Sequence, residues 1–265
     1  MTTDLANSRR GFSVGHVVFA AVMIALGILG LLKGDFAPIW QPSPKNIPAQ
    51  EVVIYLCALV SLLCGIGLLW QRTVAVAARV LLIYLLVWLL LFRVFRIFVA
   101  PTAQDSWSGF GETAVMVAGA WVLYAWFAAD RDRQYVGFAT GGIGLRAARI
   151  LYGLALVIFG VAHFNYLKDT ATLVPAWLPW PVVWAFFFGC AFIVAGAAII
   201  IGLCARVAAA LSALQIGLFT VVVWVPVVAK GSNAFQWSEF LISVAVTAGA
   251  WVVADSYQQK LRIKN

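Results

Sequence analysis

The most restrictive feature of this sequence is a set of long apolar runs that carry no charge. The run from Val182 to Leu203 has 22 residues and no Asp, Glu, Lys or Arg. A helix of about 20 mainly apolar residues crosses the roughly 30 Å of hydrocarbon in a bilayer. Only 11% of the 265 residues are charged, whereas soluble domains average about 25%. The chain is therefore predicted to be an integral membrane protein.

Several segments reach or approach the length of a membrane span. A transmembrane β-barrel would show segments of about ten residues that alternate apolar and polar side chains, but these segments are apolar on every face. The fold class predicted is all-α, a polytopic membrane protein with eight transmembrane helices. The predicted spans are residues 15–32, 52–70, 74–92, 111–129, 149–166, 182–203, 207–228 and 239–254.

The basic residues at the ends of these spans predict the orientation. Cytoplasmic loops carry an excess of Lys and Arg, and the richer side would hold both termini. We therefore expect a multi-pass protein of the bacterial cytoplasmic (inner) membrane with both termini in the cytoplasm. Most of the net charge of +8 comes from basic residues at the cytoplasmic ends of the spans, where topology and anionic lipids explain it. No nucleic-acid partner is therefore expected. The richer side holds Arg9, Arg10, Arg72, Arg79, Arg131, Arg133, Arg146, Arg149, Arg206, Lys260, Arg262 and Lys264, and the other side Lys33, Lys45, Arg93, Arg96, Lys168 and Lys230.

The two halves of the sequence resemble each other. Gly119-Ala120-Trp121 and Gly249-Ala250-Trp251 coincide at an offset of 130. Similar offsets relate Gly65 to Gly196, and Pro38-x-Trp40 to Pro175-x-Trp177. We predict two tandem four-helix bundles, parallel because each has an even number of spans. Residues 1–129 would form the first unit, 130–148 a cytoplasmic linker and 149–265 the second unit.

Two motifs in the second half carry a family resemblance. Gly160-Val161-Ala162-His163-Phe164 precedes Leu173-Val174-Pro175-Ala176-Trp177-Leu178-Pro179, and a span with Gly189 and Gly196 follows. This pattern resembles the DoxX family of bacterial four-helix membrane proteins, and the first half looks like a diverged copy with Gly30 in place of His163. Cys190, Ala191 and Phe192 stand where related proteins often have an acidic residue. The resemblance implies a membrane partner in redox systems, one relative being a subunit of a thiosulfate:quinone oxidoreductase.

Ionisable residues near the predicted outer ends of the spans are the candidates for chemistry, because such residues in membranes are often functional. We expect His163, Glu239 and Glu112 to move protons. Tyr166, Trp177, Arg93 and Arg96 would bind a ligand at one outward-facing cavity, or the arginines would form a separate ion-pair network with Glu112. The structural alternative is that the arginines and carboxylates suit the helix ends and that His163 and Trp177 are interfacial anchors.

The cofactor and the function remain open at this stage. The two histidines, His16 and His163, are predicted near opposite membrane faces, and no haem-attachment or metal motif is present. The resemblance to the DoxX family implies a quinone as the cofactor to consider. The leading hypothesis is a redox accessory subunit, the membrane part of a quinone-linked oxidoreductase with a soluble partner. The alternatives are a non-catalytic transporter or binding protein for small molecules, and a structural assembly partner of a membrane complex. The sequence does not fix the oligomeric state.

Overall fold

The computed structural model describes residues 11–41, 43, 47–231 and 233–262. In these residues all regular secondary structure is helical, which confirms the all-α class. Some of the charges used to predict the orientation lie outside the described residues, namely Arg9, Arg10, Lys45 and Lys264.

Among the described residues, eight helices are long and apolar enough to cross a membrane, as predicted. Two of these spans are interrupted by a π-helical turn, η2 in the third span and η3 in the seventh. The spans are α1 (Val14–Lys33), α2 (Gln50–Leu68), α3 (Val74–Val87) with η2 (Trp88–Val94) and α4 (Phe95–Val99), α5 (Gln104–Phe127), α8 (Gly142–Asn165), α10 (Pro181–Ile201), α11 (Ala205–Phe219) with η3 (Thr220–Trp224) and α12 (Val225–Ala229), and α13 (Ala234–Arg262).

The connections also contain short helices, and one of them differs from the prediction. The expected linker 130–148 is largely helical, because α6 (Asp130–Tyr135) and α7 (Gly137–Thr140) follow each other and α8 already begins at Gly142. Trp121 Nε1 donates a hydrogen bond to the carbonyl of Ala139 at 2.9 Å, which fixes this connection against α5. The remaining short helices are η1 (Pro38–Trp40) and α9 (Leu167–Thr172).

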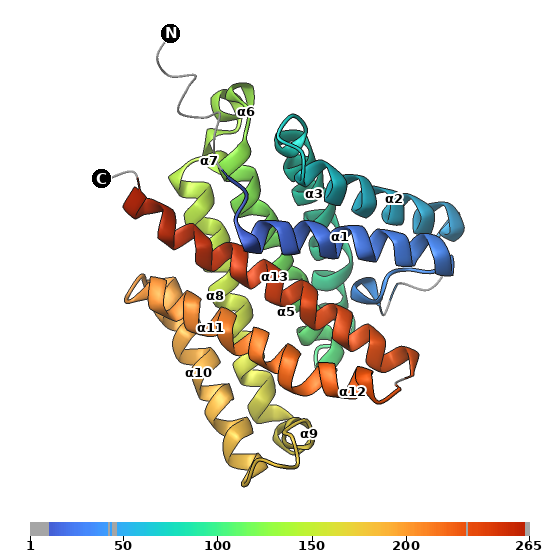
Figure 1. Ribbon diagram of the computed structural model, residues 1–265, viewed down its shortest axis with the longest axis vertical. Coiled ribbons are helices and arrows are strands. Elements are labelled where there is room, and N and C mark those ends of the chain that lie inside the picture. The colour runs from blue at the N-terminus through green and yellow to red at the C-terminus, as the bar shows by residue number, and fades with distance from the viewer. Residues whose placement is uncertain (1–10, 42, 44–46, 232, 263–265) are drawn as a thin grey trace.

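The helix ends gather on two opposite sides of the molecule (Figure 1). The start of α1, the end of α13 and the connections α2–α3, α5–α6 and α10–α11 lie toward the upper left. The connection α1–α2, the segment α9 and the end of α12 lie toward the lower right. This alternation is the arrangement that eight successive membrane crossings require.

The first two spans of each half pack through corresponding small residues. A Cβ atom on Gly27 of α1 would meet the carbonyl oxygen of Ala58 in α2 at 2.7 Å, and one on Gly160 of α8 would meet that of Gly189 in α10 at 2.7 Å. Missing side chains let helix backbones approach closely in a membrane. The pairs α1–α2 and α8–α10 are therefore built in the same way.

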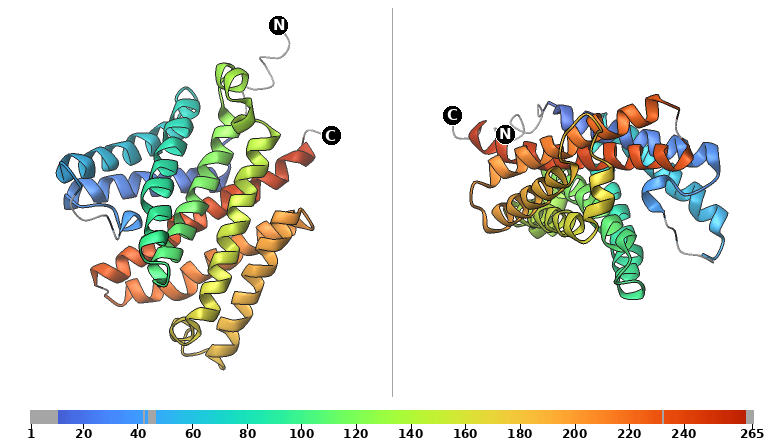
Figure 2. Two further views of the ribbon diagram at one scale, coloured as in Figure 1. Left: turned by 180° about the vertical axis from the view of Figure 1, so that it is seen from behind. Right: turned by 90° about the horizontal axis from the view of Figure 1, so that it is seen from below.

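Helices α5 and α13 cross at the centre of the molecule (Figure 2). A Cβ atom on Gly119 of α5 would lie 3.0 Å from the Cα atom of Gly249 in α13. Helix α5 also packs against α8, and α13 against α1, so the halves interlock around one continuous core. The division into units 1–129 and 149–265 stays a prediction, and these matched contacts support it.

Candidate functional site

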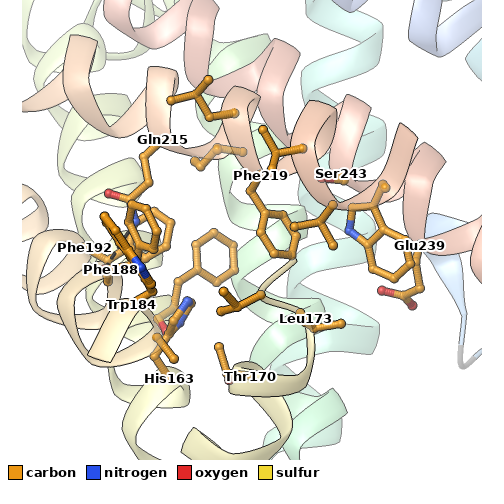
Figure 3. A pocket seen from close by; sticks show the side chains of 18 of the residues that line it. His163, Thr170, Leu173, Trp184, Phe188, Phe192, Gln215, Phe219, Glu239 and Ser243 are labelled. Atoms are coloured by element: carbon orange, nitrogen blue, oxygen red, sulfur yellow. Dashed lines mark hydrogen bonds between the residues drawn. The ribbon is translucent and has the colours of Figure 1, made fainter. Parts of the chain in front are cut away.

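A cavity of about 430 Å³ lies among α5, α8, α10, α11 and α13, with the segment after α9 at its rim. Figure 3 shows the side chains of α10 and α11 on one side and Glu239 of α13 on the other. Most of the lining is aromatic or aliphatic, which suits an apolar ligand. The polar side chains that line it are Gln104, Ser108, Glu112, His163, Thr170, Gln215, Glu239 and Ser243.

His163 occupies the last turn of α8 and lines this cavity. Its Nδ1 atom lies 2.8 Å from the carbonyl oxygen of Phe159, and its ring meets the ring of Phe192 edge-on with centroids 5.4 Å apart. Because a carbonyl only accepts, Nδ1 carries the proton in this bond, and Nε2 of the neutral ring is an acceptor. His163 can therefore take a proton or a hydrogen bond from a ligand hydroxyl.

Two carboxylates also line the cavity. Glu112 comes from α5 and Glu239 from α13, and Figure 3 shows Glu239 on the opposite side from His163. Glu112 interacts electrostatically with both Glu239 and Arg93. A ligand that fills the cavity would thus lie between an imidazole and a carboxylate pair, each able to exchange protons with it.

Trp177 and Tyr166 lie at different places relative to the cavity. Trp177 lines the rim while 72% of its surface stays exposed. Tyr166 follows α8 and donates through its hydroxyl to the carbonyl of Thr102 at 3.2 Å. It is not among the lining residues, so its contact joins the end of α8 to the start of α5.

The two arginines also lie away from the cavity. Arg93 is 2% exposed and donates to the carbonyls of Ile39 and Gln41, the latter at 3.1 Å. Arg96 is partly exposed and forms a salt bridge with Asp105. Neither lines the cavity, and their hydrogen-bonding partners differ from the expected Glu112, which lines the cavity instead. Arg93 holds the loop that follows α1.

Sequence reasoning missed Gln215 and Ser243. Gln215 of α11 donates through Nε2 to the carbonyl of Phe188 in α10 at 3.2 Å. Ser243 Oγ lies 2.6 Å from Thr220 Oγ1, which lies 2.8 Å from Thr247 Oγ1. A glutamine in the middle of a predicted span is an available signal, because polar groups at membrane depth are costly unless they have partners.

The described residues contain no group of three or more His, Cys, Asp or Glu side chains that could hold a metal ion. The four cysteines are free. The titratable side chains in the lining of the cavity are His163, Glu112 and Glu239.

Trp40, which matches Trp177 in the sequence, is packed inside the first half. Trp40, at the end of η1, is 1% exposed. Its ring stacks on Trp88 with centroids 4.9 Å apart and an interplanar angle of 10°, and it meets Tyr84 edge-on at 5.3 Å. Trp40 is therefore packed in the first half, whereas Trp177 lies at the rim of a cavity in the second half.

The comparisons with known proteins concern the second half. Residues 144–227 match the DoxX family, a range that runs from α8 through α10 and α11 into α12. The family match does not extend to the first half. No curated protein and no solved structure matches the chain. The resemblance predicted for the second half is thus confirmed as a match of residues 144–227 to the DoxX family, within a multi-pass membrane protein.

Proposed function

We propose that this protein binds a quinone in the cavity of its second half and acts as the membrane subunit of a quinone-linked oxidoreductase. The observation that carries the proposal is an apolar cavity with the acceptor nitrogen of His163 on one side and the carboxylates of Glu112 and Glu239 on the other. A quinone in its reduced, hydroquinone form has a hydroxyl donor at each end of an apolar ring, so its shape and polarity match these acceptors.

The proposed roles of the residues follow from the chemistry of a quinone, which takes up two electrons and two protons to become a hydroquinone. The electrons would come from a soluble oxidoreductase. A protonated His163 would give one proton to the nearer oxygen, and a protonated Glu239, beside Glu112, would give the other. The neutral His163 would then accept a hydrogen bond from the new hydroxyl. The aromatic side chains around the ring would keep bulk water away.

We also propose the orientation that the basic loops predict. Both termini would lie in the cytoplasm of a bacterium, and the cavity would open in the outer leaflet of the inner membrane. The distribution of Lys and Arg supports this choice, and the loops near Lys168 and Lys230 would then be outside. Single cysteines introduced at these two positions should react with an impermeant thiol reagent added to intact spheroplasts.

A non-catalytic binding or transport protein is the second candidate. The matched glycine contacts of the two halves favour it, because many transporters are built from repeated units that move against each other around a binding site. In that case the same cavity would bind a small apolar molecule without electron transfer.

Quinone binding by the purified protein tests the proposal. Wild-type protein in nanodiscs should bind a short-chain hydroquinone, kept reduced and measured by calorimetry, and His163→Ala should lose about tenfold or more in affinity, as expected for a hydrogen bond from the ligand hydroxyl to Nε2. His16→Ala is the matched control. His16, in α1, forms a hydrogen bond with the carbonyl of Leu68 at the end of α2 and lies outside the cavity. Equal affinities of the wild type and His163→Ala would contradict the assignment. Flux of quinone without electron transfer would favour the second candidate.

A further inference from the structure

The two halves share an interhelical hydrogen bond at one sequence offset. Tyr84 donates through its hydroxyl to the carbonyl of Cys57 at 3.4 Å, and Gln215 donates through its amide to the carbonyl of Phe188 at 3.2 Å. Both donors and both acceptors are related by an offset of 131. The third and seventh spans are therefore joined to the second and sixth by the same contact.

The same offset identifies the counterpart of the ring that holds Trp40. Trp88 corresponds to Phe219, and Phe219 lines the second-half cavity. Figure 3 shows the Phe219 ring among the side chains that surround the open space. In the first half, Trp88 presents its face to an indole. In the second half, the corresponding ring of Phe219 borders the cavity.

The contact that keeps the first-half tryptophan in place has no equivalent in the second half. Arg93 holds the carbonyls on both sides of Trp40, but the residue at offset 131 from Arg93 is Trp224. The corresponding loop tryptophan, Trp177, is largely exposed. In the first half an indole ring therefore occupies the place beside Trp88, whereas the corresponding place beside Phe219 in the second half is part of the cavity.

We infer that the second-half cavity binds a flat aromatic or quinonoid ring stacked on Phe219, in the position that Trp40 occupies on Trp88. Stacking of parallel rings is a favoured geometry for such systems. The cavity volume of about 430 Å³ leaves room beside the ring for an apolar substituent. Gln215, at the position of Tyr84, would face the edge of the ring.

This inference deepens the proposed function, because it specifies the shape of the ligand, but it does not require that the ligand be reduced. Two features distinguish it from a cavity that accepts any apolar molecule. The ligand must be planar, and affinity must depend on the ring of Phe219 rather than on its apolar surface alone.

The test compares three probes on the full-length protein in nanodiscs by calorimetry. They are 2-methyl-1,4-naphthoquinone, the redox-inactive flat ring 1,4-dimethoxynaphthalene, and decalin-1,4-dione, which has a similar outline without planarity. We expect both flat probes to bind and the decalin to bind about tenfold more weakly or worse. Phe219→Leu should remove the preference for flat probes, and Phe219→Trp should retain it. Phe235→Leu, which changes an exposed phenylalanine outside the cavity, should change nothing.

Equal binding of flat and saturated probes, or a preference that survives Phe219→Leu, would overturn the inference. The outcomes also separate it from the proposed function. Binding of dimethoxynaphthalene that depends on Phe219, together with no His163-dependent hydroquinone binding, would retain the inference and reject the quinone role. Hydroquinone binding that depends on His163 but not on Phe219 would reject the inference and retain the quinone role.

Discussion

Two tryptophan loops, one in each half of the molecule, occupy opposite environments. In the first half Trp40 is 1% exposed and is packed between Trp88 and Tyr84. In the second half Trp177 is 72% exposed and lines the rim of a cavity. The tryptophan of this loop thus packs into the core in the first half and lies at the rim of a cavity in the second half. Stability and ligand binding should therefore be separable by substitutions in the two halves.

The largest effect should come from Trp40→Ala. This substitution removes a fully buried indole and leaves a cavity, which typically costs about 3–5 kcal/mol of unfolding free energy. Trp177→Ala is the matched control and should cost less than about 0.5 kcal/mol, as for other exposed sites. Unfolding in mixed micelles with increasing denaturing detergent measures both. Equal losses of stability would remove the distinction between the two loops.

Arg93→Met should have the next largest effect. The buried guanidinium binds the carbonyls of Ile39 and Gln41, and hydrogen bonds to charged groups contribute about 1.5–3 kcal/mol each. We expect a loss of about 2–3 kcal/mol, and a loss smaller than the sum in the double variant with Trp40→Ala, because both changes release one loop.

Arg96→Met is the control for this prediction, since exposed ion pairs such as that of Arg96 with Asp105 contribute about 0–1 kcal/mol. The same unfolding measurement applies. Additive losses for Arg93 and Trp40 would show that the arginine does not hold the tryptophan loop.

The prediction of the fold rested on a strong physical signal. Apolar length alone identifies membrane-spanning helices, because every backbone polar group must be satisfied within the segment. The connection at 130–148 was harder to predict, because α6 and α7 are short and polar and α8 extends to Gly142 beyond its apolar part. Composition does not define where a helix continues outside the bilayer.

The candidate site was predicted in part, because the positions of ionisable residues along the spans indicate their depth in the membrane. His163, Trp177, Glu112 and Glu239 were grouped by their depth in the membrane, and the structure brings all four to one cavity. Arg93 was grouped with Arg96 on one helix face, but the π-helical turn at Trp88–Val94 changes the local period. One arginine is buried and the other is partly exposed.

Gly189→Ala should produce a smaller loss of stability that reaches the ligand site. A Cβ atom at Gly189 would lie 2.9 Å from the Cβ atom of His163, so the helices or the imidazole must shift. Overpacking of this kind costs about 1–3 kcal/mol, and we expect weaker quinone binding with it. Gly217→Ala meets only an ordinary contact with Thr247 at 3.4 Å, so its binding and stability should stay near the wild type. If Gly189→Ala binds quinone with the affinity of the wild type, the position of His163 does not determine binding.

Photoaffinity labelling with an azido-naphthoquinone tests the central claim most directly, because it reports which half of the molecule binds the ring. Protein in nanodiscs is irradiated with and without excess unlabelled naphthoquinone, digested and mapped by mass spectrometry. We expect competable labels in α8, α10 and α11 around His163 and Phe219. We expect none around Trp40 and Trp88, where the chain's own indole fills the space. Competable labels in the first half, or equal labelling of both halves, would contradict this claim.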